Sequence, residues 1–235
     1  MRYPNITEAV FLKRPNRFIA IVRIGDREET AHVKNTGRCR ELLVEGARVW
    51  LVRSDNPERR TAYDLVAVEK QTRHGAILIN MDSAMPNDAA FEWLSSGGLV
   101  PEPDSVRREV TCGASRFDFL VEKDGRRTYV EVKGCTLEQD GVARFPDAPT
   151  ERGVKHIEEL TRLAEEGIGA VILFVVQMRP IRAFTPNYAT HRAFGEALVR
   201  ARDAGVQILA VDSVVEADSL VVGNFIPVEL SEEIE

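Results

Sequence analysis

The feature that most restricts the fold is the dipeptide Asp124-Gly125, which lies between two stretches of alternating apolar and polar residues. Asp-Gly is a strong signal for a two-residue β-hairpin turn. The turn sets the register of the strands predicted over 116–122 and 128–137. In that register Asp118 lies directly opposite Glu131 on one face of the hairpin.

The other face of the predicted hairpin is apolar and carries Phe117, Phe119, Val130 and Val132. A slip of one residue would exchange the two faces and bury the charged side chains. The alternation on both strands therefore supports the register, and we expect the apolar face to pack on the core.

Two carboxylates that face each other across a sheet destabilise it, by roughly 0.2–1 kcal/mol per pair. A bound Mg²⁺ or Mn²⁺ reverses the sign, because these ions prefer oxygen ligands. Lys133 lies on the same face as Glu131 and can hold an attacking water or stabilise charge on a phosphate. Asp118, Glu131 and Lys133 are therefore candidate catalytic residues of a metal-dependent nuclease. The spacing alone also fits a charged ladder on a solvated sheet face.

Two further acids are candidate metal ligands beside Asp118 and Glu131. If Gly113-Ala114 is the preceding turn, Glu109 faces Asp118, although this turn is a weaker signal. Glu92 lies on the helix predicted over 88–95 and is a second candidate.

Short predicted strands dominate the first third of the chain, at 17–23, 30–33, 47–52, 62–70 and 76–79. This spacing is typical of a small barrel or sandwich, and the oligonucleotide-binding (OB) barrel is one member of that set. Residues 80–87 read as a connector in which Pro86 is the breaker. We therefore predict one domain over 1–83 and a second over 84–235.

The second domain reads as helix, three strands, helix, strand, helix, strand. The segments are 88–95, 106–112, 116–122, 128–137, 150–166, 170–176, 187–204 and 206–211, with a loop at 141–149. Antiparallel strands followed by an α/β crossover predict a mixed sheet with helices on its faces. The fold class is therefore α/β.

Charge is distributed unevenly along the chain. The net charge is −6, but residues 1–87 carry 15 Lys and Arg against 11 Asp and Glu. The first part is mildly basic and suits phosphates, whereas the acidic remainder suits hard cations. A random distribution of surface charge is the alternative. The candidate phosphate contacts in the basic part are Lys13, Arg17, Lys34, Arg38 and Arg40, and those at the start of the helix 150–166 are Arg152 and Lys155.

Several other classes of protein are excluded by the sequence. The three cysteines form no CxxC pair, and no HExxH, GxSxG or P-loop motif occurs. Phe18 and Trp50 lie in apolar strands, so we assign them to the core rather than to base stacking. The longest apolar run, 170–176, is too short to span a bilayer. We expect a cytoplasmic protein with no membrane partner.

Several stretches of the chain, taken together, resemble the sugar fermentation stimulation protein A family. They are Asn35-Thr36-Gly37, Pro86-Asn87, Glu109-Val110, 115–120, Glu131-Val132-Lys133, the long stretch from Phe145 to His156, Glu159-Leu160 and 205–210. The matches run in order from about residue 13 to the end of the chain.

The resemblance implies an N-terminal OB barrel and a C-terminal domain like the PD-(D/E)xK nucleases, with flanking helices. It also implies DNA binding and a regulatory link to sugar use in bacteria. Asp118, Glu131 and Lys133 match the acid, acid and lysine of the nuclease motif. The family usually has an Asp near the start of the last helix, where this sequence has His191.

Two hypotheses about function follow. The first is a Mg²⁺- or Mn²⁺-dependent nuclease acting on DNA or RNA, and the second is a non-catalytic DNA-binding regulator with a vestigial nuclease fold. The sequence leaves the oligomeric state open.

Overall fold

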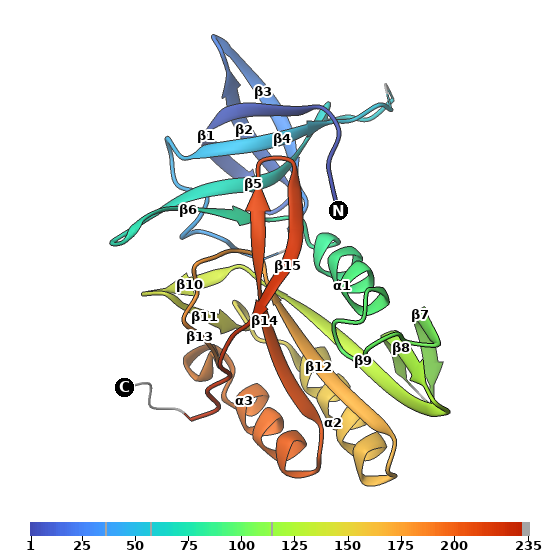
Figure 1. Ribbon diagram of the computed structural model, residues 1–235. Coiled ribbons are helices and arrows are strands. Elements are labelled where there is room, and N and C mark those ends of the chain that lie inside the picture. Colours follow the sequence, from blue (N-terminus) through green and yellow to red (C-terminus); the bar gives the residue numbers. More distant parts are fainter. Residues whose placement is uncertain (36, 57, 114, 232–235) are drawn as a thin grey trace.

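The structure, a computed structural model, describes residues 1–35, 37–56, 58–113 and 115–231. Figure 1 shows a small β-barrel at one end of the molecule and a larger layered α/β part at the other. None of the helices in the described residues is long and apolar enough to cross a membrane.

The barrel contains β1 (Ile6–Asn16), β2 (Ile19–Ile24), β3 (Arg27–Val33), β4 (Arg48–Arg53), β5 (Tyr63–Thr72) and β6 (Gly75–Asn80). The strands lie in the order β3-β2-β1-β4-β5-β6, and parallel pairing of β3 with β5 closes the barrel. The interior is apolar, with Val22, Val49 and Leu65 fully buried. Closure decides between the barrel and the sandwich that the strand spacing left open.

Strand β1 was not predicted, because the first strand expected from the sequence, over 17–23, corresponds to its partner β2. Its pairing with β2 shifts register between Phe11 and Lys13 and again between Lys13 and Asn16. Such bulges insert extra residues and break the two-residue alternation that reveals a strand. The signal in the sequence was therefore weak, although the strand is at the centre of the barrel.

The α/β part is built on a six-stranded sheet in the order β15-β14-β12-β9-β8-β7. Its strands are β7 (Ser105–Cys112), β8 (Ser115–Lys123), β9 (Arg126–Cys135), β12 (Gly169–Val176), β14 (Gln207–Glu216) and β15 (Ser219–Phe225). Strands β9, β12 and β14 are parallel, whereas β7, β8 and β15 pair antiparallel at the two sides. The predicted mixed sheet is confirmed.

Helices cover both faces of this sheet. On one face α1 (Met85–Ser95) packs Ala90 and Leu94 on the strands, and on the other α2 (Glu151–Glu165) and α3 (Tyr188–Asp203) pack side by side. Alternate residues of the central β12 point to opposite faces: Leu173 lies with α1, and Phe174 with α2 and α3. Burial on both faces explains the continuous apolar run in β12.

A small third sheet completes the α/β part, in the order β10-β11-β13. Its strands are β10 (Leu137–Gln139), β11 (Val142–Phe145) and β13 (Ala183–Pro186). The loop predicted over 141–149 is therefore wrong in part, because β11 pairs in parallel with β13, a partner distant in the sequence. Strands β13 and β15 were also not predicted.

Pro86 is part of helix α1 and not a breaker in a connector. The helix begins at Met85 with proline in its first turn. Proline is tolerated there, because the first N–H groups of a helix have no partner within the helix. The connector prediction for 80–87 is therefore wrong at its end.

A buried polar network joins the barrel to the α/β part. Asp82 is 2% exposed, and its Oδ2 lies 2.6 Å from Nζ of Lys34 and accepts a hydrogen bond from the hydroxyl of Tyr3 at 3.2 Å. Next to it, Nε2 of Gln177 donates to Oδ1 of Asn80 at 3.0 Å. Buried polar groups with satisfied hydrogen bonds restrict geometry, so this network fixes the orientation of the two parts.

Candidate metal centre and nucleic-acid interface

The predicted hairpin register is confirmed, and its ladder ends beside Asp118. Strands β8 and β9 pair from Lys123↔Arg126 to Phe119↔Val130. Beyond that point the backbone N–H of Val132 donates to Oδ2 of Asp118 at 2.8 Å. A side-chain carboxylate therefore takes a position that a ladder carbonyl would otherwise occupy, and the strands separate there.

Because of this local irregularity, Phe117 lies on the face of the sheet opposite to the one predicted. The sequence placed Phe117 on one face with Phe119 and Val132, but Phe117 packs on the other face against Tyr129, with ring centroids 5.5 Å apart. That prediction is wrong because the regular alternation of β8 breaks where the strand leaves β9.

Asp118 accepts hydrogen bonds from helix α1 and from the neighbouring strand β9. Nδ2 of Asn87, in the first turn of α1, donates to Oδ1 at 2.8 Å, while Oδ2 accepts from Val132. Burial raises the pKa of Asp118, and the nearby charge of Glu131 raises it further. Two like charges therefore share this site, which a cation would stabilise.

Glu131 is the most deeply buried member of the site, at 3% exposure. Its Oε1 accepts hydrogen bonds from Nζ of Lys133 and from Nδ1 of His156. Its Oε2 is also buried, and no described residue donates a hydrogen bond to it. Burial alone would raise the pKa of Glu131, but the bonds from His156 and Lys133 outweigh it and hold the pKa below its usual range.

His156 is buried on α2 and connects Glu131 to the helix. Its Nε2 lies 3.4 Å from Nε of Arg152, one turn earlier. The arginine can only donate, so the two contacts together select the tautomer in which Nδ1 carries the proton and Nε2 accepts. The exposed Arg152 is thereby brought to the candidate site, whereas Lys155 is exposed on the same helix.

His191 supports the start of the helix that carries His156. Oγ1 of Thr150 caps α2 by accepting from the N–H of Gly153 at 3.0 Å, and the N–H of Thr150 donates to Nδ1 of His191 at 3.2 Å. The side chain of His191 is 12% exposed, and its Nε2 lies 3.2 Å from Glu151. His191 therefore contacts the α2 cap rather than Asp118 or Glu131.

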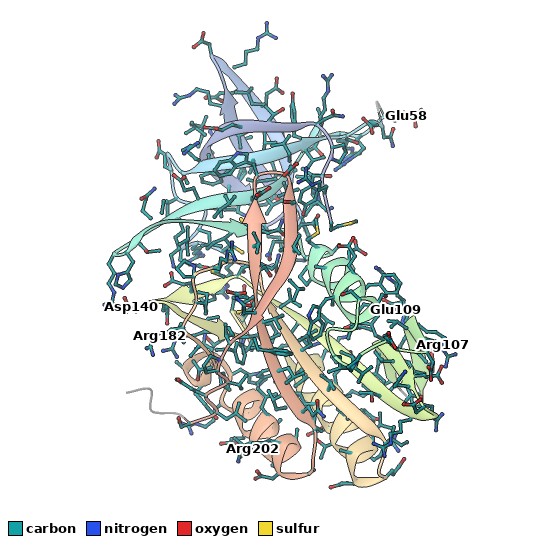
Figure 2. The ribbon with its side chains drawn as sticks, viewed as in Figure 1. Glu58, Arg107, Glu109, Asp140, Arg182 and Arg202 are labelled. Atoms are coloured by element: carbon teal, nitrogen blue, oxygen red, sulfur yellow. The ribbon has the colours of Figure 1, made fainter. Side chains whose placement is uncertain are left out.

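The two additional acids proposed from the sequence are engaged elsewhere. Oε2 of Glu109 lies 2.8 Å from Nε of Arg116, and Figure 2 shows Glu109 at the outer edge of the sheet. Glu92 pairs with the amino group of Met1 at 2.8 Å. The turn proposed at Gly113-Ala114 includes a residue outside the described part, but β7 and β8 have the register that it predicted. Among the described residues, no three His, Cys, Asp or Glu side chains form a metal-binding group.

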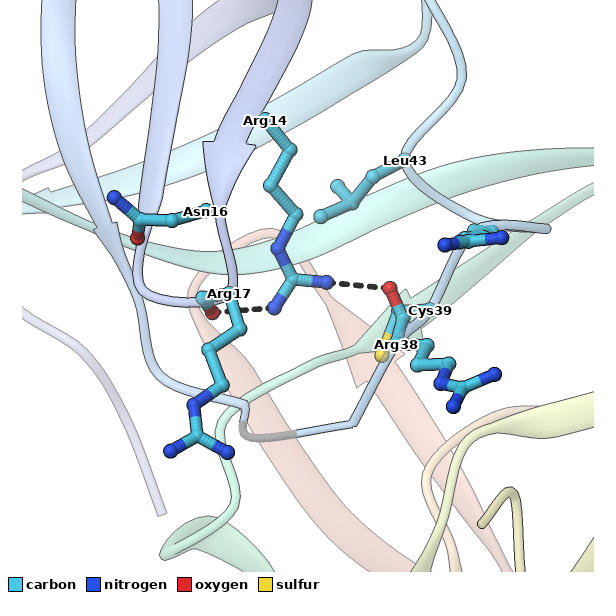
Figure 3. Close-up of a pocket in the computed structure, with 7 residues that line it drawn as sticks. Arg14, Asn16, Arg17, Arg38, Cys39 and Leu43 are labelled. Carbon is cyan, nitrogen blue, oxygen red and sulfur yellow. Dashed lines mark hydrogen bonds between the residues drawn. The ribbon is translucent and has the colours of Figure 1, made fainter.

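Arginines gather in a pocket of about 270 Å³ on the barrel, shown in Figure 3. It is lined by Arg14, Asn16, Arg17, Arg38, Cys39, Arg40 and Leu43. Arg14 organises it, because its guanidinium donates to the carbonyl oxygens of Arg17 and Arg38, both at 2.5 Å. The side chains of Arg17, Arg38 and Arg40 are exposed, and it is Arg14 that holds the backbone of the pocket in place.

Two predicted phosphate contacts lie outside this arginine pocket. The ammonium group of Lys34 pairs with the buried Asp82 at the junction. Lys13 is exposed on β1 but does not line the pocket.

A second, polar pocket of about 190 Å³ lies between the barrel and the candidate metal centre. Asn35 and Gly37 line it from the barrel, and Gly134 lines it next to Lys133. The carbonyl of Asn35 accepts from Arg14 at 3.1 Å, so the loop of this pocket is tied to the arginine pocket. Thr36 of this loop lies outside the described residues.

Sequence reasoning missed Asn87 and the role of His156. The sequence indicated only that Lys155-His156 starts a capped helix, and a solvated pair was the favoured interpretation. Burial of His156 depends on how α2 packs on the sheet, for which the sequence carried no local signal. Asn87 was assigned to the connector, and its contact with Asp118 depends on the helix starting at Met85.

Comparison with known proteins identifies both parts of the chain. The family described as "Sugar fermentation stimulation protein RE domain" matches residues 84–219, and the one described as "SfsA N-terminal OB domain" matches residues 12–79. The barrel is therefore an OB barrel, as predicted.

Relatives that match nearly the whole chain indicate the same family. A sugar fermentation stimulation protein homolog of Desulfitobacterium hafniense (strain Y51) is 52% identical over 232 residues, covering 99% of this chain and 100% of that protein. The homolog of Clostridium beijerinckii is 46% identical over 230 residues, covering 98% and 100%. The solved structure of Pyrococcus furiosus SfsA in complex with Ca²⁺ matches with a TM-score of 0.85 at 28% identity, over 97% of this chain and 98% of that one. This chain belongs to the sugar fermentation stimulation protein family.

Proposed function

We propose that this protein is a Mg²⁺- or Mn²⁺-dependent phosphodiesterase that cleaves nucleic acid, with DNA the expected substrate and RNA the alternative. Residues 84–235 carry the chemistry, and residues 1–83 bind the substrate. The observation that carries the proposal is Oε2 of Glu131, a buried carboxylate oxygen without a hydrogen-bond donor among the described residues, beside Asp118. An unsatisfied buried polar atom calls for an explanation, and a cation supplies one.

The residues present fit such an ion. Mg²⁺ is typically bound by one or two carboxylates and keeps several waters, so Asp118 and Glu131 suffice without a third acid. The relative from Pyrococcus furiosus was solved with Ca²⁺, another oxygen-seeking cation. A cation held here would stabilise negative charge on a phosphoryl oxygen as a Lewis acid.

The side chains around Glu131 have distinct roles in this proposal. His156 and Lys133 both donate to Oε1, which leaves Oε2 available to hold a cation. The ammonium group of Lys133 is positioned to stabilise the charge that develops as water attacks phosphorus and the bond to the leaving sugar oxygen breaks. Asn87 orients the carboxylate of Asp118 by donating a hydrogen bond to its Oδ1.

The second hypothesis, a non-catalytic DNA-binding regulator, is favoured by one observation. The ammonium group of Lys133 already pairs with Glu131, His156 donates to the same oxygen, and the described residues provide no third acid ligand. In that case the barrel binds DNA and the acidic site is vestigial.

Asp118→Asn is expected to weaken Mn²⁺ binding at least tenfold, since changes even in the outer shell of a metal site cost roughly 10–100-fold. Isothermal titration calorimetry on the full chain measures this. Glu109→Gln is the matched control, because that acid is exposed and paired with Arg116, and it should bind as the wild type does. Equal affinity of the Asp118→Asn variant and the wild type would contradict the metal assignment.

Cleavage is tested on single-stranded, duplex and branched DNA and on RNA, each with Mg²⁺, Mn²⁺ or EDTA. Metal-dependent cleavage that Asp118→Asn abolishes supports the nuclease. Binding without cleavage of any of these substrates supports the regulator.

Arg38→Ala and Arg40→Ala are each expected to weaken DNA binding and flatten its salt dependence. Removing the cation that neutralises one phosphate reduces the slope of log K against log salt by about 0.7 for single strands and about 0.9 for duplex. Fluorescence anisotropy over a salt series measures the slope. Arg23→Ala is the control, because Arg23 is exposed on β2 but does not line the arginine pocket. A slope unchanged in both variants would count against this surface.

A further inference from the structure

Phe18 is an exposed aromatic side chain beside the arginine pocket, although the sequence assigned it to the core. It is 43% exposed, at the turn between β1 and β2. That prediction is wrong because Phe18 precedes β2, where the apolar alternation that favoured burial begins only with Ile19 and Ala20. Its ring is therefore available for contact with a ligand.

The backbone holds Phe18 in a fixed position. Oδ1 of Asn16 accepts from the N–H of Phe18 at 2.9 Å and from that of Ile19 at 3.1 Å. The carbonyl of Phe18 accepts from the N–H of Val33 at 2.8 Å. The ring is therefore presented by a tight turn joined to β3, which reduces the conformational entropy cost of binding a ligand.

One cation lies against this ring, and others line the neighbouring pocket. The guanidinium carbon of Arg17 lies 4.7 Å from the centroid of Phe18, a cation–π contact that orients both side chains. Arg17 also lines the arginine pocket with Arg38 and Arg40. Among the described residues, none of these three arginines forms an ion pair with a carboxylate. A ligand that satisfies this surface must bring negative charge together with a flat apolar face.

A single-stranded nucleic acid has both properties. Proteins that bind single strands combine a cationic groove for the backbone with aromatic side chains on which bases stack. In a duplex the faces of the bases are covered by their neighbours, so a fixed ring at the surface gains nothing from them. An apolar protein partner fits less well, because Arg17 lies over the ring and the neighbouring pocket is lined mostly by arginines.

We propose that Phe18, backed by Arg17, is a base-stacking platform, and that the nucleic-acid ligand of the barrel is single-stranded. This inference rests on the proposed function, since it assumes that the barrel binds nucleic acid. It adds the substrate class, a single strand with an unpaired base stacked on Phe18.

Fluorescence anisotropy tests the platform with two probes, a labelled single-stranded oligodeoxythymidylate and a labelled, fully paired blunt-ended DNA duplex. Without divalent metal, which prevents cleavage, the wild type should bind the single strand more tightly. Phe18→Ala should weaken single-strand binding roughly 5- to 150-fold, which corresponds to the loss of one stacked base, and leave duplex binding unchanged. Phe18→Tyr, which keeps the ring, should restore the wild-type affinity.

Val44→Ala is the matched control, because Val44 is a similarly exposed apolar residue of the same barrel, at 52%, outside the arginine pocket. An equal decrease in affinity for both probes in Phe18→Ala, or no decrease for either, overturns the platform while DNA binding by the barrel stands. If the wild type binds neither probe, DNA binding as proposed fails, and the platform fails with it. Circular dichroism of each variant confirms that the fold is retained.

Discussion

Glu131→Gln is expected to lower the rate of metal-dependent nucleic-acid cleavage by roughly 10³-fold, equivalent to about 4 kcal/mol of transition-state stabilisation. The substitution removes the negative charge proposed to hold the cation. It also weakens the hydrogen bonds from Lys133 and His156, because the amide oxygen that remains is uncharged. The shape of the side chain is nearly unchanged. The effect should therefore appear in the rate of chemistry at saturating substrate rather than in DNA binding by the barrel.

The rate is measured under single-turnover conditions with Mn²⁺, on whichever substrate the wild type cleaves. Glu138→Gln is the matched control, because Glu138 is also a buried glutamate, 4% exposed, whose carboxylate pairs with a lysine, Lys70, at 2.6 Å. It should lose stability but keep its cleavage rate when folded. A Glu131→Gln protein that cleaves as fast as the wild type would exclude the proposed centre and point to a contaminating nuclease.

Phe174→Ala is expected to lower the free energy of unfolding by about 3–5 kcal/mol, the usual cost of truncating a buried phenylalanine. Phe174 is fully buried in β12, and its ring lies 4.0 Å from that of Phe184 and 5.7 Å from that of Phe145, centroid to centroid. The substitution would leave a cavity and remove the contacts that join β12 to β11, β13 and α3. This is a large fraction of the stability of an ordinary domain.

Urea unfolding followed by circular dichroism measures the change. Phe225→Ala is the control, since Phe225 is 56% exposed on the edge strand β15, and it should cost less than about 1 kcal/mol. A Phe174→Ala protein as stable as that control would show that the aromatic cluster does not hold the sheet to its helices.

The sequence predicted those parts of the fold whose signals are local. The Asp124-Gly125 turn fixed the β8–β9 register, because a two-residue turn leaves one pairing and the alternation excludes a slip. The continuous apolar run of β12 and the Thr150 cap of α2 were likewise visible, since strand burial and helix capping depend on neighbouring residues. Strands β11 and β1 were missed, because the first depends on a distant partner and the second is broken by bulges.

For the candidate site, the sequence by itself brought Asp118, Glu131 and Lys133 together, since three residues on two strands of one hairpin need no other contact to define their neighbourhood. Only the tertiary structure placed His156 on Glu131 and Asn87 on Asp118, and moved Glu92 and Glu109 away. These positions depend on how the helices pack on the sheet and on which charged side chains form ion pairs. Packing of this kind is decided by the whole core at once, and no short stretch of sequence encodes it.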